Sequence, residues 1–505
     1  RPACLEKTIM EDASVKIVTQ RDAPSLVTLR RVIIFIVCAY TAIFGVPLWF
    51  GTTAIYRASL PVDEINSLVN DLTNDILVKI PVTVIGSASY DSVGIERAAN
   101  RKVVEKYPLL ADIWQIQLKE VADSELDYVV KLLETKETPG TTTSLVDREI
   151  TIGYSPEIAK NPAVIQDLVA SSLVEDVFVE ELQLFNNFVV QQSAETGVSE
   201  VFPYSRRYNI VFSLFTEGGH PISWDITKVT DSLELLLHEL NDVANFSITS
   251  QVQYYSKLAI HPEYNEETKK FEIAEKDLST FINFGDWNLF SHELTPTINF
   301  VVYFADSNYE SKPLTIKGSS SQSFLVPQWG GVYLFNKDKP ILKGSTVSIT
   351  ESEISEIADV FVSQLFRLLG LPSRPKSFSI KKDILSRTST IQNLKKSLEN
   401  LVSLVKLTES LDQISIPELT KESVENALTS AKNGINSLNV QRYGEAATEA
   451  AVSLESSNKA FFEKEMVQQA YFPQEHMLAV YLPLLGPLVS IIAIGTIRTI
   501  KDIKR

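Results

Sequence analysis

Cysteine is nearly absent from this sequence. The 505 residues include two cysteines, Cys4 and Cys38, and residues 39–505 contain none. That part of the chain can form no internal disulfide, even in an oxidising compartment. The same lack excludes a cysteine nucleophile and a thiolate metal site after position 38. A body of this length must instead be held together by its buried apolar core.

Histidine is scarce as well, and no common catalytic motif is present. Of the five histidines, His238 with Glu239 begins like the zinc-binding H-E-x-x-H motif, but Asp242 stands where the second ligand belongs. A single His beside Glu on an amphipathic helix is more typical of a surface residue. The sequence has no G-x-S-x-G elbow, Walker A motif or G-x-G-x-x-G fingerprint. We therefore predict no catalytic residue, metal site or cofactor.

Charge is missing from two long stretches, one near each end of the chain. Residues 32–56 and residues 477–497 carry no charged side chain. About 20 apolar residues are enough to cross a hydrocarbon core, so each run predicts a transmembrane helix. A cleaved signal peptide is the alternative for the first run. The long segment before it and the lack of a small-x-small cleavage site disfavour that alternative.

Basic residues flank both runs on the side away from the interval between them. Arg30 and Arg31 precede the first run, and residues 498–505 contain four basic side chains. The positive-inside rule then places both termini in the cytoplasm and the interval across the membrane. The predicted organisation begins with a cytoplasmic tail (1–31), a transmembrane helix (32–56) and a lumenal α/β domain (57–375). A lumenal helical segment (376–476), a second transmembrane helix (477–497) and a short cytoplasmic tail (498–505) follow.

The interval between the two runs is acidic. Outside residues 1–57 and 476–505 the chain holds 36 basic and 58 acidic residues, a net charge of −22. This balance disfavours nucleic acid and anionic lipid as its partners. A merely soluble surface is the simpler meaning of the charge. The interval also contains an N-glycosylation sequon, Asn245-Phe246-Ser247, which agrees with a secretory lumen and makes Asn245 the candidate glycosylation site.

Strand-like and helix-like patterns alternate between residues 75 and 375. The pattern predicts strands at 76–85, 114–118, 208–215, 246–260 and 298–304, and helices at 125–134, 165–192, 226–240 and 350–370. Pro81 indicates that the first strand is an edge strand or carries a bulge. Thr350 and Glu353 form a capping box, and Gly370 ends that helix. This alternation predicts an α/β domain, mostly one mixed sheet with packed helices.

Helical periodicity without strand signal follows this domain. Residues 383–470 contain few aromatic side chains and long stretches with apolar residues at helical spacing. Pro417 and the Asn433-Gly434 pair punctuate them. We therefore expect a C-terminal helical segment of two or three helices. The predicted fold class is an α/β lumenal domain plus this segment, flanked by two transmembrane helices.

Two groups of residues are candidates for contacts with other proteins. Pro327, Trp329, Gly330 and Gly331 place a large ring beside a backbone that can turn sharply, which favours a subunit-docking surface. The alternative is a strand with a bulge and a buried Trp. In the apolar runs, small residues and prolines that shape helix packing are the candidates: Gly45, Pro47, Pro483, Gly486 and Pro487.

Several short motifs, in this order along the chain, resemble those of the PIG-S family, the S subunit of GPI transamidase. They are FGVPLW (44–49), YRASLP (56–61), WDI (224–226), SQVQYYS (250–256), TINF (297–300), FLVPQWGGV (324–332) and QLFRLLG (364–370). Each motif is moderately specific, and the two terminal spans around a large body add to the resemblance. It covers nearly the whole chain from about residue 30, although much of residues 120–200 matches no such motif.

The resemblance implies a role in the endoplasmic reticulum membrane. The complex of that family removes the C-terminal apolar signal of a proprotein and attaches a glycosylphosphatidylinositol (GPI) anchor. Its nucleophile belongs to a separate caspase-like subunit, so the resemblance implies a non-catalytic accessory subunit. Its expected partners are the other transamidase subunits, membrane lipid and, as a further candidate, the proprotein or GPI substrate.

Two other classes of function remain open at this point. One is an independent membrane-anchored lumenal hydrolase or transferase, which would be active as a purified single chain. The other is a general lumenal scaffold or chaperone, which would bind many clients without a selective effect on anchored proteins. The sequence does not separate a structural role within the complex from substrate recognition.

Overall fold

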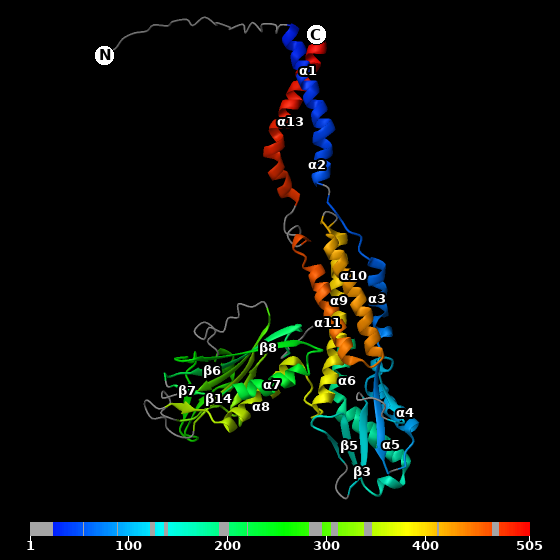
Figure 1. Cartoon of the computed structure of the whole chain (residues 1–505), viewed down its shortest axis with the longest axis vertical. Helices are drawn as coiled ribbons and strands as arrows, with labels where there is room; N and C mark the ends of the chain where they lie inside the picture. The colour runs from blue at the N-terminus through cyan, green and yellow to red at the C-terminus, as the bar shows by residue number, and fades with distance from the viewer. Residues whose placement is uncertain are drawn as a thin grey trace, which may run out of the picture. The chain divides into compact units, whose positions relative to one another are not determined.

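The computed structural model divides into two compact units (Figure 1). The first unit comprises residues 1–58, 408–418 and 462–505, and the second comprises residues 59–407 and 419–461. The residues that the structure describes are 24–53, 55–87, 89–121, 127–135, 140–190, 201–219, 221–281, 295–304, 312–337, 346–411, 414–466 and 474–504.

The apolar runs of the first unit are helical over residues 32–53 and 477–497. Helix α1 (Pro24–Tyr40) continues through the π-helical turn η1 (Thr41–Gly45) into α2 (Val46–Thr53). Within the described residues, Ser25–Leu48 is the one stretch long and apolar enough to cross a membrane. Helix α13 (Gln474–Lys504) contains the second predicted span and packs against α1. That α13 also crosses the membrane stays a prediction.

The chain that leaves α2 is fixed to residues 408–418. The guanidinium of Arg57 donates hydrogen bonds to the carbonyl oxygens of Thr408 at 2.6 Å and Leu411 at 3.0 Å. The Tyr56 hydroxyl donates to the Glu418 carboxylate at 2.7 Å. The backbone of this segment also forms a parallel bridge between Arg57 and Ile416. Arg57 is thus a structural clamp as well as a charge that closes the first apolar run.

The second unit contains two five-stranded sheets. The first sheet has the order β2-β1-β3-β5-β4, in which β4 is antiparallel to its neighbour and the other pairs are parallel. Helix α4 packs on β2, and α5 packs on α4. The elements of this part are α3 (Val62–Asp75), β1 (Val78–Gly86), α4 (Ser92–Lys106), η2 (Pro108–Leu110), β2 (Trp114–Lys119), β3 (Tyr128–Glu134), β4 (Thr141–Thr143), β5 (Glu149–Tyr154), η3 (Ile158–Lys160), α5 (Pro162–Ser171), η4 (Ser172–Val177) and α6 (Val179–Val190).

Two features of this sheet correct the sequence-based expectations. The helix predicted at 125–134 is wrong, because Tyr128–Glu134 is strand β3, paired in parallel with both β1 and β5. Its apolar residues fill a sheet interior, where tertiary pairing overrides local propensity. The edge strand predicted from Pro81 is also wrong, because β1 lies between two neighbours. Pro81 pairs with Gln117 of β2, but β3 pairs with β1 only from Val82 onward. The missing N–H of Pro81 therefore interrupts no hydrogen bond to β3.

The second sheet has the order β13-β14-β11-β6-β8. The strands β14, β11, β6 and β8 run parallel, and β13 is antiparallel to β14. The elements of this part are β6 (Arg207–Thr216), β7 (Ile222–Ser223), α7 (Thr227–His238), β8 (Asn245–Gln253), β9 (Glu263–Asn265), β10 (Lys270–Ile273), η5 (Glu275–Thr280), β11 (Thr297–Phe304), β12 (Leu314–Ile316), β13 (Ser323–Val326), β14 (Gly330–Phe335), β15 (Val347–Ser348) and α8 (Glu351–Leu369).

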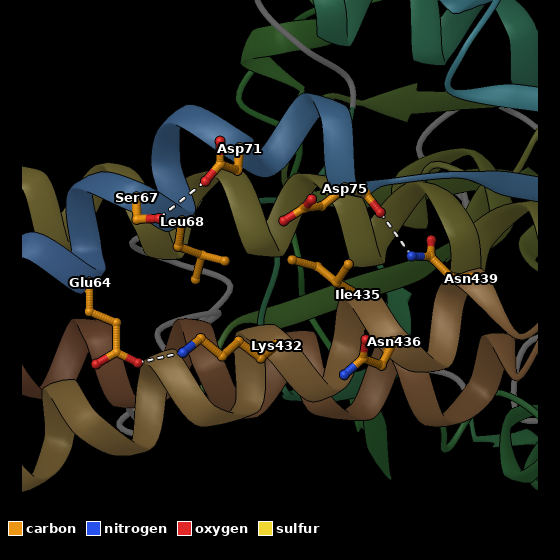
Figure 2. Close-up of a pocket in the computed structure, with 9 residues that line it drawn as sticks. All are labelled: Glu64, Ser67, Leu68, Asp71, Asp75, Lys432, Ile435, Asn436 and Asn439. Atoms are coloured by element: carbon orange, nitrogen blue, oxygen red, sulfur yellow. Dashed lines mark hydrogen bonds and ion pairs between the residues drawn. The ribbon is translucent and has the colours of Figure 1, made fainter.

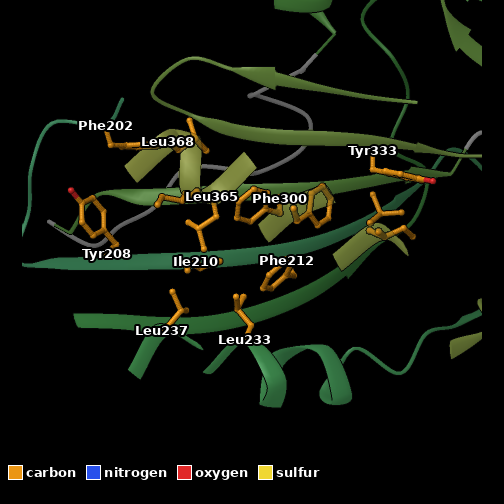
Figure 3. Packing of buried hydrophobic residues seen from close by; sticks show 14 of the residues in the cluster. Phe202, Tyr208, Ile210, Phe212, Leu233, Leu237, Phe300, Tyr333, Leu365 and Leu368 are labelled. Carbon is orange, nitrogen blue, oxygen red and sulfur yellow. The ribbon is translucent and has the colours of Figure 1, made fainter. Parts of the chain in front are cut away.

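Helices α7 and α8 contribute to the core on one face of this sheet. Figure 3 shows Leu233 and Leu365 from these helices converging with Phe212 and Phe300 of the strands. The Phe300 ring lies 4.8 Å from that of Phe361 on α8. The predicted capping box of Thr350 and Glu353 is confirmed, and Gly370 ends α8 in the left-handed conformation. On the opposite face, alternate strand residues enter a second buried cluster with β10 and β12.

The expectation of mostly one sheet is therefore wrong, although a mixed α/β fold is confirmed. Strands β7 and β15 form a small parallel pair, and β9, β10 and β12 form a three-stranded sheet. Alternating strand and helix patterns show that strands exist but not which strands pair. The division into two sheets depends on contacts between segments far apart in sequence.

The predicted C-terminal helical segment is confirmed as three long helices that lie side by side, α9 (Phe378–Ser410), α10 (Glu418–Asn439) and α11 (Tyr443–Phe461) (Figure 1). Their contacts are rich in small residues. A Cβ on Gly434 of α10 would lie 3.4 Å from the backbone nitrogen of Ala450 on α11. The buried hydroxyls of Ser397 and Ser453 lie 2.8 Å apart and join α9 to α11.

A buried ionic network connects α9 to the first sheet. The Arg387 guanidinium donates two hydrogen bonds to Glu181 of α6, at 2.6 and 2.7 Å, and both side chains are fully buried. Arg387 also donates to the Tyr128 hydroxyl of β3 at 2.9 Å, and that hydroxyl donates to Asp383 at 2.7 Å. Asp383 accepts two further hydrogen bonds from Arg148, at 2.6 and 2.8 Å.

Two groups of this network, Tyr128 and Arg387, have pKa values raised well above their usual values. Burial raises the pKa of Tyr128 well above its usual value, against the opposing effect of the Arg387 charge. Burial lowers the pKa of Arg387, but the charge and hydrogen bonds of Glu181 outweigh it and raise that pKa well above its usual value. Near neutral pH the phenol stays protonated and the guanidinium stays charged. The hydrogen bonds that join Arg387 and Tyr128 to α6, β3 and α9 therefore keep their donors near neutral pH.

We predict that Arg387→Met destabilises the second unit by roughly 3–5 kcal/mol, because the substitution leaves the Glu181 carboxylate buried without its counter-charge. The check is thermal unfolding of the full chain in detergent, followed by tryptophan fluorescence. Trp114 is a local reporter, since its indole donates to Glu181 at 3.2 Å.

The matched control is the double variant Arg387→Met with Glu181→Gln. It removes both charges and leaves Trp114 an acceptor, so part of the lost stability should return. An unchanged unfolding midpoint in Arg387→Met would contradict the role assigned to the network.

Candidate functional site

A surface groove of about 540 Å³ lies between α3 and α10 (Figure 2). Its lining is mostly polar: Glu64, Ser67, Leu68, Asp71, Asp75, Lys432, Ile435, Asn436 and Asn439. Figure 2 shows Lys432 reaching across the groove to an ion pair with Glu64. At the other end, the amide of Asn439 donates to the backbone oxygen of Asp75 at 2.8 Å.

These interactions give the groove a structural meaning. Asn439 also accepts a hydrogen bond from the backbone of Leu77 at 2.9 Å, so it fastens the end of α3 and the start of β1 to α10. The Ser67 hydroxyl donates to Asp71 at 3.1 Å within α3. These polar contacts join α10 to α3 and to the segment that follows it, or stay within α3. The groove thus follows the packing of α3 against α10.

The histidines are spread along the chain, and none is among the described lining of this groove or of the groove between α7 and α8. His238 at the end of α7 and His261 are both exposed. His220 and His292 lie outside the described residues, and His476 is helical in α13. Among the described residues no group of three His, Cys, Asp or Glu side chains is placed to hold a metal ion.

A second groove, of about 590 Å³, lies between α7 and α8. Apolar side chains of both helices line it, among them Val229, Leu236 and Val362, and Asp225, Glu351 and Asp359 stand around them. All three apolar residues also pack against the core beneath the helices. The described lining contains no basic side chain. The Thr350 hydroxyl at its edge donates to Glu353 at 2.8 Å as part of the capping box of α8. The apolar side chains of the lining suit contact with another apolar surface.

The predicted docking residues form the turn of a β-hairpin. Strands β13 and β14 are antiparallel, and residues 327–329 connect them, with Gln328 in the left-handed conformation at φ +53°. Pro327 is exposed, whereas Trp329 is half-buried and packs against the second core cluster. The bulge offered as the alternative is thus replaced by a tight turn. Docking at this turn stays a prediction.

Gly330 and Gly331 are buried for a steric reason. A Cβ on Gly330 would overlap the backbone oxygen of Asn299 on β11, and φ there is +152°. A Cβ on Gly331 would overlap the side-chain amide of Gln364 on α8. The amide nitrogen of Gln364 donates to the Phe324 carbonyl at 3.3 Å, which fixes its position. The glycine pair therefore lets β14 approach both β11 and α8.

We predict that Gly331→Ala destabilises the fold by roughly 1–3 kcal/mol through overpacking. Adding Gln364→Ala should recover part of this loss, because the clash is with the end of a side chain. The same addition should not help Gly330→Ala, whose clash is with backbone. Thermal unfolding of the four variants measures this, and equal recovery in both backgrounds would contradict the steric account.

Asn245, the candidate glycosylation site, is the exposed first residue of β8. Its backbone N–H donates to the Arg206 carbonyl at 2.8 Å, and its side chain lines a surface pocket with Arg206, Arg207 and Glu455. The side chain is accessible to modification from solvent. Glycosylation there stays a prediction.

The predicted membrane-helix residues lie within helices, and the space around the two glycines, Gly45 and Gly486, is not filled by the other helix. Gly45 lies in the π-helical turn and its Cβ would meet only Thr41 of the same helical run, and a Cβ on Gly486 would meet nothing within 4 Å. Pro47 lies in α2, and Pro483 and Pro487 lie inside α13. The close approach of the two helices is at Gly495, where a Cβ would lie 3.0 Å from Ile34. The sequence analysis missed this glycine, although small residues commonly mark such contacts.

Comparison with known proteins places the chain among proteins of one kind. Residues 35–505 match the family model PIG-S, phosphatidylinositol-glycan biosynthesis class S protein. The chain is 30% identical to the GPI transamidase component GPI17 of Saccharomyces cerevisiae, over 94% of this chain and 92% of that protein. It is 24% identical to the GPI-anchor transamidase component PIGS of Rattus norvegicus, over 91% of this chain and 93% of that protein. It is also 25% identical to the GPI transamidase component PIG-S homolog of Schizosaccharomyces pombe, over 92% of this chain and 82% of that protein.

Proposed function

Because the chain belongs to the PIG-S family, we propose that it is an accessory subunit of the GPI transamidase complex. The observation that carries this proposal is the extent of the match. It runs from residue 35 to residue 505 and so includes both apolar runs, both sheets and the helical segment. The shared part is therefore the whole architecture rather than one module.

Its role in the complex is non-catalytic in this proposal. Residues 39–505 contain no cysteine, so a thiol nucleophile must come from another subunit, which we identify with a caspase-like protein. Three fully buried titratable groups, Arg387, Glu181 and Tyr128, are engaged with one another. In this proposal the chain contacts its partners through exposed strand and turn residues, apolar grooves and membrane helices.

In this proposal the chain lies in the endoplasmic reticulum membrane, with the body in the lumen and both termini in the cytoplasm. The basic residues at 30–31 and 498–505 support this orientation by the positive-inside rule. In this arrangement residues 32–56 and 477–497 span the membrane, and residues 57–375 and 376–476 are lumenal. Membrane lipid is then a partner of both spans.

Glycosylation tests this orientation directly. We predict that the full chain expressed in its host migrates faster after endoglycosidase treatment, and that Asn245→Gln removes the shift. Ser247→Ala, which breaks the same sequon and keeps the asparagine, should behave like Asn245→Gln. A wild-type chain that shows no shift would remove the support that the sequon gives to a lumenal body.

Purification from gentle detergent tests membership of the complex. We predict that the tagged full-length chain brings down a fixed set of membrane proteins that includes a caspase-like subunit, identified by mass spectrometry. The same preparation should transfer a GPI anchor to a proprotein, and the chain purified alone should not. Recovery of a folded chain without partners would contradict the proposal, and hydrolytic activity of the single chain would favour an independent enzyme.

The hairpin turn is tested in the same preparation. Trp329→Ala should lower recovery of the other subunits if the turn docks one of them, because aromatic anchors dominate interfaces. Pro327→Ala probes the exposed tip without disturbing the core, and Trp329→Phe retains a ring. Unchanged recovery in a normally folded Trp329→Ala chain would remove the turn from consideration.

A further inference from the structure

The second five-stranded sheet ends at an open edge. Strand β8 pairs with β6 over its whole length, from Asn245 opposite Arg207 to Gln253 opposite Phe215, and no other strand in the described part of the chain pairs with it. Figure 1 shows β8 at the margin of this sheet. A strand with one neighbour presents its second row of N–H and C=O groups to whatever lies outside.

The hydrogen bonds to β6 show which residues of β8 point their backbone N–H and C=O groups away from β6. The N–H of Asn245 donates to Arg206, toward β6. In a parallel pair, successive residues point their backbone groups to alternate sides of the strand. The backbone groups that point away from β6 therefore belong to four residues: Phe246, Ile248, Ser250 and Val252.

This edge lacks the features that usually keep an edge strand from pairing. Residues 245–253, NFSITSQVQ, contain no charged side chain and no proline. Edges are ordinarily blunted by charge, by proline, by a bulge or by short length. At nine residues, β8 is longer than the usual strand of about 5–6 residues. The opposite edge of the same sheet, β13, is only four residues long.

Three exposed side chains lie at the end of β8: Val252 in the strand, and Tyr254 and Tyr255 directly after it. Val252, Tyr254 and Tyr255 are 40%, 39% and 73% exposed. Tyr255 has a φ of +60°, uncommon for a bulky residue, and its N–H donates to Gly218 at 3.3 Å. Backbone held in this region tends to mark functional sites. Tyr is also enriched in protein interfaces, where its ring supplies contact area and its hydroxyl a hydrogen bond.

We propose that the outer edge of β8 receives an extended segment of another transamidase subunit as an added strand. The four outward residues span about 20 Å at 3.3 Å per residue, which suits a partner strand of about six residues. The edge of β8 offers backbone groups but no charged side chain, so the partner segment that pairs with it is uncharged. Its apolar side chains contact Val252, Tyr254 and Tyr255. This inference rests on the proposed function and names the surface through which one partner binds.

A single cysteine at the edge can identify what lies beside it. With Cys4→Ser and Cys38→Ala, the chain has no thiol, so Ser250→Cys is unique. Labelled with a maleimide–benzophenone and illuminated in the purified complex, this chain should form an adduct with another subunit. Ser67→Cys on α3, also an exposed serine, is the matched control and should form none.

Proline supplies the second arm, because it removes one outward N–H and leaves the ladder with β6 intact. Ser250→Pro should lower recovery of the cross-linked subunit at least tenfold, whereas Ser250→Ala, which keeps that N–H, should not. Both variants should unfold within a few degrees of the wild type. If Ser250→Pro does not fold, the Ser250→Cys adduct decides alone.

The outcomes separate this inference from the proposed function. If the wild-type chain recovers no transamidase subunits, the proposed function fails. If it recovers them but Ser250→Cys forms no adduct, or Ser250→Pro recovers them fully, the edge is not an interface. An adduct between two copies of this chain would overturn the inference in favour of self-pairing.

Discussion

The buried pair of Arg387 and Glu181 is the constraint on which the arrangement of the second unit depends. Both side chains are withdrawn from water, and either charge alone would cost several kcal/mol to bury. The pair fixes α9 against α6, and the Tyr128 hydroxyl extends the same network to β3 and Asp383. Because the charges must meet, the register of a 33-residue helix on the first sheet is specified. Apolar packing alone would tolerate a shift more readily, and the body has no disulfide to prevent one.

Sequence patterns predicted elements whose formation is local and missed those fixed by distant partners. The helix from Thr350 to Gly370 was predicted with both ends, because its capping box and its terminal glycine lie within the helix itself. Strand β3 was mistaken for a helix, since its environment comes from neighbours that the local pattern does not contain. Arg387 and Glu181 lie more than 200 positions apart, and neither carries a local signal of burial. The same holds for Arg57, whose partners Thr408 and Leu411 lie more than 350 positions away, and for Gly495.

The candidate functional residues divide in the same way. The aromatic–glycine composition of residues 327–331 predicted a docking surface, which stays a prediction, and its two glycines meet a steric demand of Asn299 and Gln364. Composition did not predict the open edge of β8. The lack of charge in this strand becomes informative only when its position at the edge of the sheet is known. The groove between α3 and α10 and the groove between α7 and α8 are both lined by the side chains of packed helices. The proposed accessory role directs attention to surfaces, sheet edges and membrane helices.

We propose that the chain serves GPI transamidase by contact and not by bond-making chemistry. The most direct measurement is GPI anchoring of a reporter proprotein in cells that lack the chain, complemented by a version with all five histidines replaced by Gln: His220, His238, His261, His292 and His476. All five lie between the two apolar runs, and histidine is the commonest acid–base residue of enzymes. The account predicts anchoring equal to that of the wild type, with the complex recovered intact. An intact complex that no longer transfers the anchor would contradict it.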